Sequence, residues 1–203
     1  CSVTLLNSTH PSIADVLLKI ISLEFHPTVM AAEGEGAYEH MMRVAEKFKG
    51  KFIFAVEGAV PVAHDGKCCV VAEADHHEVT MTEVTKVLAA NAAAVLAVGT
   101  CAAYGGIPAG KGNETGAMGV SAFLKKEGIP APVINIPGCP PHPDWIVGTI
   151  GLGLQALATN TLGLLVKQGL DANGRPKAFY KNVHMNCPHL SAFEAGHMVK
   201  TMS

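Results

Sequence analysis

The sequence predicts an α/β fold in which a parallel sheet is covered by helices on both faces. Apolar runs of strand length alternate along the chain with segments whose apolar residues recur at helical spacing, which is typical of βαβ units. Two of these runs are followed by a glycine and then a cysteine, at Cys101 and Cys139. Because ligands of open α/β sheets bind outside the carboxyl ends of the strands, these cysteines stand where such folds hold their chemistry.

The composition is that of a well-packed domain. The 203 residues are 49% hydrophobic and 16% charged, which suits one α/β domain followed by a tail and argues against disorder. The net charge of -2 gives no electrostatic reason to expect nucleic acid or an anionic membrane as a partner. No apolar run reaches about 18 residues, so no transmembrane segment is expected.

The first elements are expected to be helical and then extended. Residues 1–6 form a short apolar turn or helix start. Ser12 is a good N-cap, and apolar residues recur after it at helical spacing, so a helix is expected over 12–23. A strand is expected over 25–31, although Pro27 weakens its start.

A buried strand and a hairpin are expected next. A helix over 38–48 carries its apolar residues on one face. The run 52–57 is largely apolar and is bounded by Gly58, as in a buried strand. Residues 60–74 predict a hairpin around Asp65-Gly66, a strong turn pair.

The two strands that lead into the cysteines lie in the second half of the chain. Thr80 and Glu83 form a capping box that opens a helix to about residue 90. The apolar runs 92–98 and 133–136 are the two strands. Between and after them we expect a Gly-rich connection over 105–116, a helix over 117–127, a helix to residue 158 capped by Asp144, a weak helix over 161–168, a turn over 171–174 and a polar tail over 175–203.

Cys1, Cys101 and Cys139 form the main candidate metal site. Thiolates select soft or borderline metals, and ligands that arrive singly from separate loops suit an iron–sulfur cluster better than a zinc site, where Cys-x-x-Cys pairs are usual. Isolated cysteines are usually small hydrophobes, but the repeated strand–glycine–cysteine pattern favours ligation. The adjacent glycines let the backbone approach a bulky cofactor.

Other groups are weaker candidates. His184 and Cys187 could face one metal, although from the residues alone a surface tail is the better interpretation. Cys68 and Cys69 lie in a predicted strand, where neighbours point to opposite faces, so we interpret them as structural. The groups interpreted as solvated turns are His76-His77 with Glu73 and Asp75, and Glu33-Gly34-Glu35. No G-x-G-x-x-G phosphate loop and no G-x-S-x-G nucleophile elbow is present.

Five motifs resemble those of one family, the small subunits of nickel–iron hydrogenases, and most closely its nickel–iron–selenium branch. They are CSVTLLN at 1–7, SLEFHP at 22–27, GTCAAYGG at 99–106, PGCPPHP at 137–143 and HMNCP at 184–188. The resemblance covers essentially the whole chain in order. It implies a flavodoxin-like domain over 1–160 and the start of an irregular iron–sulfur domain over 161–203.

The resemblance also implies the ligands of two 4Fe–4S clusters. Cys1, Cys101 and Cys139 match ligands of a proximal cluster, and His184 and Cys187 match ligands of a distal cluster. The family's first strand and first proximal cysteine would precede residue 1, and the remaining distal and the medial ligands would follow residue 203. The sequence is therefore expected to be a fragment, and Cys68 and Cys69 match no ligand of the family.

The function implied by the resemblance is electron transfer in a hydrogenase, which interconverts dihydrogen with protons and electrons. The nickel–iron centre is expected on a large-subunit partner, and a cytochrome c or a ferredoxin is expected as redox partner. The expected location is periplasmic, with membrane association as an alternative.

Three alternatives stay open at this point. The cluster-bearing subunit of complex I is related in fold and uses adjacent cysteines, but Cys68-Cys69 stands outside the leading cysteine loop. A non-redox protein with structural zinc would be colourless, whereas an iron–sulfur protein is brown. A flavin protein is disfavoured because cysteines stand where Ser/Thr-rich phosphate loops would be.

Overall fold

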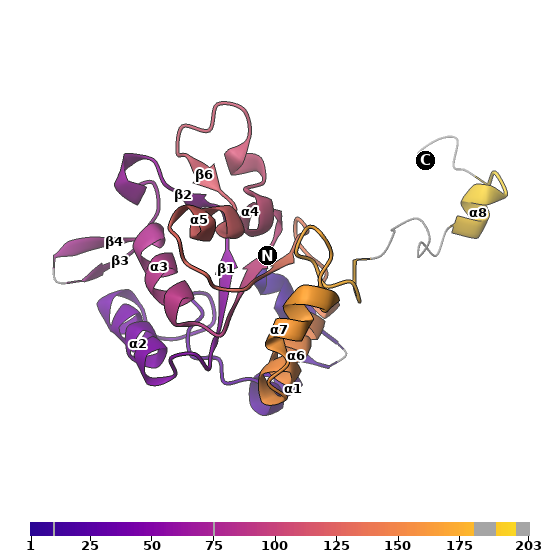
Figure 1. The fold of residues 1–203 in the computed structure, drawn as a ribbon, viewed down its shortest axis with the longest axis horizontal. Helices are drawn as coiled ribbons and strands as arrows, with labels where there is room; N and C mark the ends of the chain where they lie inside the picture. The colour runs from indigo at the N-terminus through magenta and orange to yellow at the C-terminus, as the bar shows by residue number, and fades with distance from the viewer. Residues whose placement is uncertain (10, 75, 181–189, 198–203) are drawn as a thin grey trace.

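Three parallel strands form the central sheet, in the order β1 (Ile53–Glu57), β5 (Ala94–Val98), β7 (Val133–Ile136). The computed structural model describes residues 1–9, 11–74, 76–180 and 190–197 (Figure 1). Val98 of β5 is paired with Glu57 on one side and with Ile136 on the other. The three strands therefore end at the same edge of the sheet, as the sequence predicts.

Helices cover both faces of this sheet (Figure 1). On one face, Val95 and Ala97 of β5 pack in a cluster with α3 (Met81–Asn91) and α5 (Val120–Lys126). On the other face, the alternate residues of β5 pack with α6 (Pro143–Ala158) and with the turn of π-helix over 165–169. All five residues of β5 are buried, which explains why the strand is a continuous apolar run.

Smaller elements surround the sheet. Two antiparallel pairs are β2 (Val60–Pro61) with β6 (Ala117–Met118), and β3 (Val70–Ala74) with β4 (His77–Thr80). The further helices are α1 (Ile13–Asp15), α2 (Gly34–Lys47), α4 (Thr100–Tyr104), α7 (Leu162–Leu164) and α8 (Leu190–Glu194). Short 3-10 turns lie at Ser2–Asn7, His64–Gly66 and Ile107–Ala109, and turns of π-helix at Val16–Ile20 and Leu165–Gly169.

Most predicted elements are confirmed to within a few residues. The three sheet strands coincide with β1, β5 and β7, and the predicted capping box is present, since Glu83 and Thr80 each accept the other's backbone N–H. The helix expected over 12–23 is capped by Ser12 but ends at Ile20. The helix expected over 117–127 begins at Val120, because residues 117 and 118 pair with β2.

The strand expected over residues 25–31 is wrong. The backbone nitrogens of Val29 and Met30 both donate to the carbonyl of His26, at 3.1 and 3.0 Å, so the chain turns there. Pro27 has no N–H to offer a neighbouring strand, and no strand in the described ranges pairs with this segment.

The hairpin expected over 60–74 is also wrong. Asp65 and Gly66 do form a turn, but this turn joins β2 to β3, which belong to different sheets. β3 pairs with β4, because Val79 of β4 is buried in a cluster against α2 and α3. Cys68 and Cys69 consequently lie in the turn before β3 and not within a strand.

His142, and not Asp144, is the N-cap of α6. The Nδ1 atom of His142 accepts the backbone N–H of Asp144 at 3.2 Å, and Asp144 lies in the first helical turn. The Pro at the first helical position favours this start, because its missing N–H would have no helical partner. Among the described residues, no helix has the length and apolar character needed to cross a bilayer.

Candidate metal centre

The two cysteine loops that follow β5 and β7 are bonded to each other. The backbone nitrogen of Thr100 donates to the carbonyl of Gly138 at 2.9 Å, and the nitrogen of Gly138 donates to the Thr100 hydroxyl at 3.0 Å. Cys101 lies in the first turn of α4, and Cys139 directly follows Gly138. The prediction that both cysteines emerge at one edge of the sheet is therefore confirmed.

Cys1 joins this edge through Gly99. A Cβ atom built on Gly99 would lie 2.7 Å from the Cys1 sulfur, so this sulfur rests directly on the Gly99 backbone. Gly99 has φ 92° and ψ 160°, a conformation that side chains other than glycine rarely adopt. In the same way, a Cβ on Gly106 would lie 2.7 Å from the Cys101 sulfur. Because Gly99 and Gly106 have no side chains, they leave room for the thiols of Cys1 and Cys101.

Glu57 holds the backbone beside Cys1. Its carboxylate oxygens accept hydrogen bonds from the amino nitrogen of Cys1 and the backbone N–H of Ser2, at 2.5 and 2.7 Å. No sequence motif singles out Glu57. The signal that the sequence offers is a carboxylate at the end of an otherwise apolar strand.

The Cys139 loop is held by side chains from outside it. The Thr4 hydroxyl lies 2.6 Å from the Cys1 carbonyl and 3.3 Å from that of Pro141, which ties the N-terminal turn to the loop. The Tyr180 hydroxyl donates to the carbonyl of Pro137 at 2.9 Å. Burial raises the pKa of Tyr180, so its hydroxyl remains protonated and able to donate.

The three thiols differ in exposure and do not form a single-ion site. Cys1 and Cys101 are half-buried, and Cys139 is exposed. Around one zinc ion, with Zn–S distances near 2.3 Å, the sulfurs would lie roughly 4 Å apart. No group of three or more His, Cys, Asp or Glu in the described part of the chain is close enough to hold one metal ion. Three separate thiols at one sheet edge, with space left by glycines, fit a larger cluster better.

The other candidate residues lie away from this edge or outside the described ranges. His184 and Cys187 belong to residues 181–189, which the structure does not describe. Cys68 is exposed, and burial, with a smaller effect of Cys68, raises the pKa of Cys69. Among the remaining candidates, His77 lies on β4 with Glu83 3.3 Å away, Asp75 is not described, and Glu33 is the N-cap of α2.

Comparison with known proteins gives one family model and a set of relatives. The model described as NADH ubiquinone oxidoreductase, 20 Kd subunit, matches residues 1–152. The periplasmic NiFeSe hydrogenase small subunit of Desulfomicrobium baculatum is 49% identical over 209 residues, covering 100% of this chain and 66% of the relative. The periplasmic NiFe hydrogenase small subunit 1 of Nitratidesulfovibrio vulgaris (Hildenborough) is 38% identical, covering 97% of this chain and 57% of the relative.

Solved structures are similar as well. The recombinant NiFeSe hydrogenase from Desulfovibrio vulgaris Hildenborough in the oxidized state superposes with a TM-score of 0.93 at 62% identity, covering 100% of this chain and 73% of that one. A reduced, active Ni-Fe-Se hydrogenase from Desulfomicrobium baculatum gives a TM-score of 0.91 at 50% identity, with 99% and 74% covered. The chain thus spans 57% to 66% of the length of the two curated relatives named above.

Proposed function

The chain belongs to the family of the NADH ubiquinone oxidoreductase 20 Kd subunit and, within it, to the small subunits of nickel–iron–selenium hydrogenases, and from this premise we propose its part in the reaction. It carries electrons between a nickel–iron site on a large subunit and an external acceptor, while H2 and two protons plus two electrons are interconverted. The acceptor proposed is a cytochrome c or a ferredoxin. Two relatives are named periplasmic, which supports a periplasmic location.

Cys1, Cys101 and Cys139 are the proposed ligands of a proximal 4Fe–4S cluster. When bound, the cluster supplies a site that accepts and releases electrons, with a potential that depends on hydrogen bonds and burial. The thiolates would hold the irons, and Gly99 and Gly106, which have no side chains, leave room for the sulfurs of Cys1 and Cys101. The observation that carries the proposal is the bonding of the two cysteine loops to each other through Thr100 and Gly138.

His184 and Cys187 are proposed as ligands of a distal cluster, within a second domain over residues 161–203. This part of the proposal rests on the sequence motif, because these two residues lie outside the described ranges. The first domain, over residues 1–160, contains all three proposed proximal ligands.

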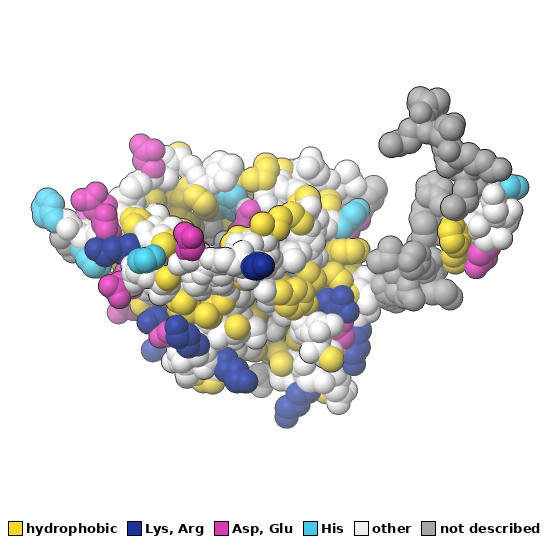
Figure 2. Space-filling model, turned by 90° about the horizontal axis from the view of Figure 1, so that it is seen from above, with side chains coloured by type: hydrophobic (Ala, Val, Ile, Leu, Met, Phe, Trp, Pro, Cys, Tyr) yellow, Lys and Arg dark blue, Asp and Glu magenta, His cyan; other side chains and the backbone are white. Residues whose placement is uncertain are grey.

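A hydrogenase large subunit is the proposed partner. Large hydrophobic side chains are exposed between the charged ones (Figure 2). Several come from the first thirty residues: Val3, Leu6, Leu18, Ile20, Leu23 and Val29. Of these, Val3 lies in the 3-10 turn that directly follows Cys1. Apolar surface of this kind is what a permanent subunit interface buries.

The test is metal analysis of the full-length protein, purified without oxygen together with its large subunit. We expect about four irons and four labile sulfides for each cluster, a brown colour and H2-dependent reduction of a dye. Zinc in a colourless protein would overturn the electron-transfer proposal. The second candidate, a complex I-type subunit, is kept because of the family model. It predicts a cluster without any H2-dependent reduction.

A further inference from the structure

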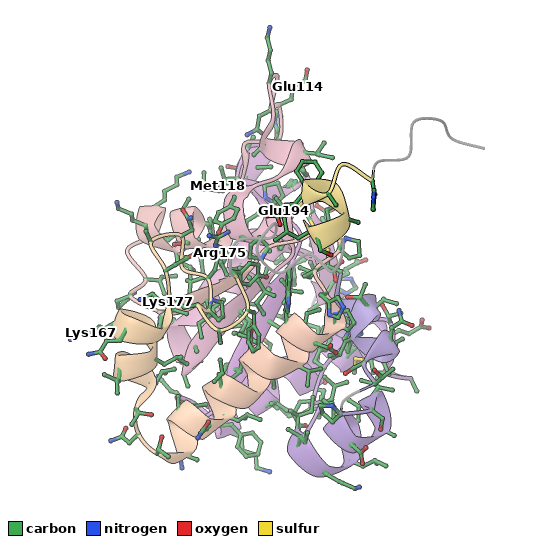
Figure 3. The ribbon with its side chains drawn as sticks, turned by 90° about the vertical axis from the view of Figure 1, so that its right-hand side faces the viewer. Glu114, Met118, Lys167, Arg175, Lys177 and Glu194 are labelled. Atoms are coloured by element: carbon green, nitrogen blue, oxygen red, sulfur yellow. The ribbon has the colours of Figure 1, made fainter. Side chains whose placement is uncertain are left out.

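Residues 170–180, here called the edge strap, cover the outer edge of the sheet. β7 is an edge strand, and its Asn135 binds the strap twice: the backbone nitrogen donates to the Gly174 carbonyl at 2.8 Å, and Nδ2 donates to the Asn173 carbonyl at 2.8 Å. Figure 3 shows Arg175 and Lys177 on this strap, near the helical turn that carries Lys167. Lys177 binds this turn through two hydrogen bonds: its backbone nitrogen donates to the Gly169 carbonyl, and its Nζ donates to the Gln168 carbonyl.

The strap ends at Tyr180, whose side chain reaches the Cys139 loop. Its ring lies 4.7 Å from that of Trp145 in α6, and the Arg175 guanidinium carbon lies 5.3 Å from the ring centre. Its hydroxyl donates to the carbonyl of Pro137, two residues before Cys139. The ring is therefore fixed from two sides while the hydroxyl contacts the loop.

The loop needs such external contacts because it has few amides of its own. Four of the seven residues 137–143 are proline, so only the other three can donate a backbone hydrogen bond. The Gly138 nitrogen is already used by Thr100. Side chains from elsewhere must therefore satisfy much of the loop's backbone and hold its position.

We propose that Tyr180 is a positioning residue for Cys139: by binding the Pro137 carbonyl it fixes the loop that presents this thiolate to the proximal cluster. The inference rests on the proposed function, since it concerns one of the proposed ligands. His184 and Cys187, the proposed distal ligands, follow Tyr180 within seven residues along the chain.

The test is Tyr180→Phe in the full-length protein with its large subunit, purified without oxygen. This change removes the hydroxyl and keeps the ring between Trp145 and Arg175. We expect loss of the proximal cluster to an iron chelator to become faster by roughly tenfold, the low end of what removal of a ligand-orienting partner costs. The midpoint potential and EPR spectrum of that cluster should shift as well.

Tyr104→Phe is the matched control. The Tyr104 hydroxyl donates to the Asn173 carbonyl at 3.1 Å, so this variant removes a similar bond from the same strap but not from the Cys139 loop. It should leave the chelation rate and the potential unchanged. Should Tyr180→Phe fail to fold, Trp145→Phe, which loosens the ring and keeps the hydroxyl, should still accelerate cluster loss.

The outcomes separate the two proposals. If the wild-type complex holds no iron, the proposed function fails. If the wild type holds its clusters and Tyr180→Phe loses them no faster than Tyr104→Phe, the positioning role of Tyr180 is overturned and the proposed function stands. Equal acceleration by both variants would mean a general loosening of the strap, which also overturns the specific role.

Discussion

Replacing Gly99 by alanine should damage both folding and the metal centre. The backbone there (φ 92°, ψ 160°) is nearly restricted to glycine, and an alanine would cost about 1–3 kcal/mol. The new Cβ would lie 2.7 Å from the Cys1 sulfur, about 1 Å inside normal contact, and such overpacking costs about 1–3 kcal/mol. The sum, roughly 2–6 kcal/mol, is a large part of the stability of a typical domain.

The assay is thermal unfolding combined with iron content of the full-length complex. At roughly 2–4 °C per kcal/mol, the expected fall in Tm is roughly 4–24 °C. Because the Cys1 sulfur must move to admit the Cβ, the iron bound per protein should fall too.

Gly112→Ala separates the backbone effect from the clash. Gly112 has φ 96°, close to that of Gly99, but no atom lies within 4 Å of a Cβ built there. This variant should lower Tm by the backbone cost alone and retain its iron. If Gly99→Ala is no less stable than Gly112→Ala and binds as much iron, the reasoning about the Cys1 seat is refuted.

Three further predictions concern polar contacts. Glu57→Gln should speed iron loss to a chelator several-fold. The free energy of unfolding should change by only about 1 kcal/mol, because the Glu57 side chain is 43% exposed. An unchanged rate of iron loss would contradict the role of Glu57 in positioning Cys1. Thr100→Val keeps the shape of the side chain but removes the hydroxyl that accepts the Gly138 N–H. The free energy of unfolding, measured with denaturant, should fall by about 1–3 kcal/mol. No change would mean that water replaces the hydroxyl as acceptor. Burial alone would raise the pKa of Asp171, but hydrogen bonds from Arg175 outweigh this effect and hold the pKa below its ordinary value of 3.8. The ionised Asp171 therefore stabilises the fold fully above pH 3.8, and this stabilisation is lost as the pH falls below 3.8. The Tm difference between wild type and Asp171→Asn should therefore shrink as the pH falls below about 4, and a constant difference would exclude this ion pair as the cause.

The candidate site could be predicted in part. Strand polarity alone placed Cys101 and Cys139 at one edge, because the ends of parallel strands coincide. Three other contacts at the site join residues that are 43 to 98 positions apart, so no local pattern encodes them. They are the packing of the Cys1 sulfur on Gly99, the hydrogen bonds from Cys1 and Ser2 to Glu57, and the hydrogen bond from Tyr180 to Pro137. The roles of His184 and Cys187 stay predictions from the motif.

The sequence by itself determined the elements whose signals are local. Continuous apolar runs marked β1, β5 and β7, and the capping box marked the start of α3, because an apolar run of strand length and end-capping are both signals carried by a few consecutive residues. Of these strands, β5 is buried along its whole length, whereas β1 buries only Val56. Only the tertiary structure decided which short strands pair. The segment 25–31 has strand-like residues, but no strand among the described residues pairs with it. β3 pairs with β4 because α2 and α3 bury Val79. A strand exists only where another strand satisfies its backbone, and that partner is chosen by packing from distant parts of the chain.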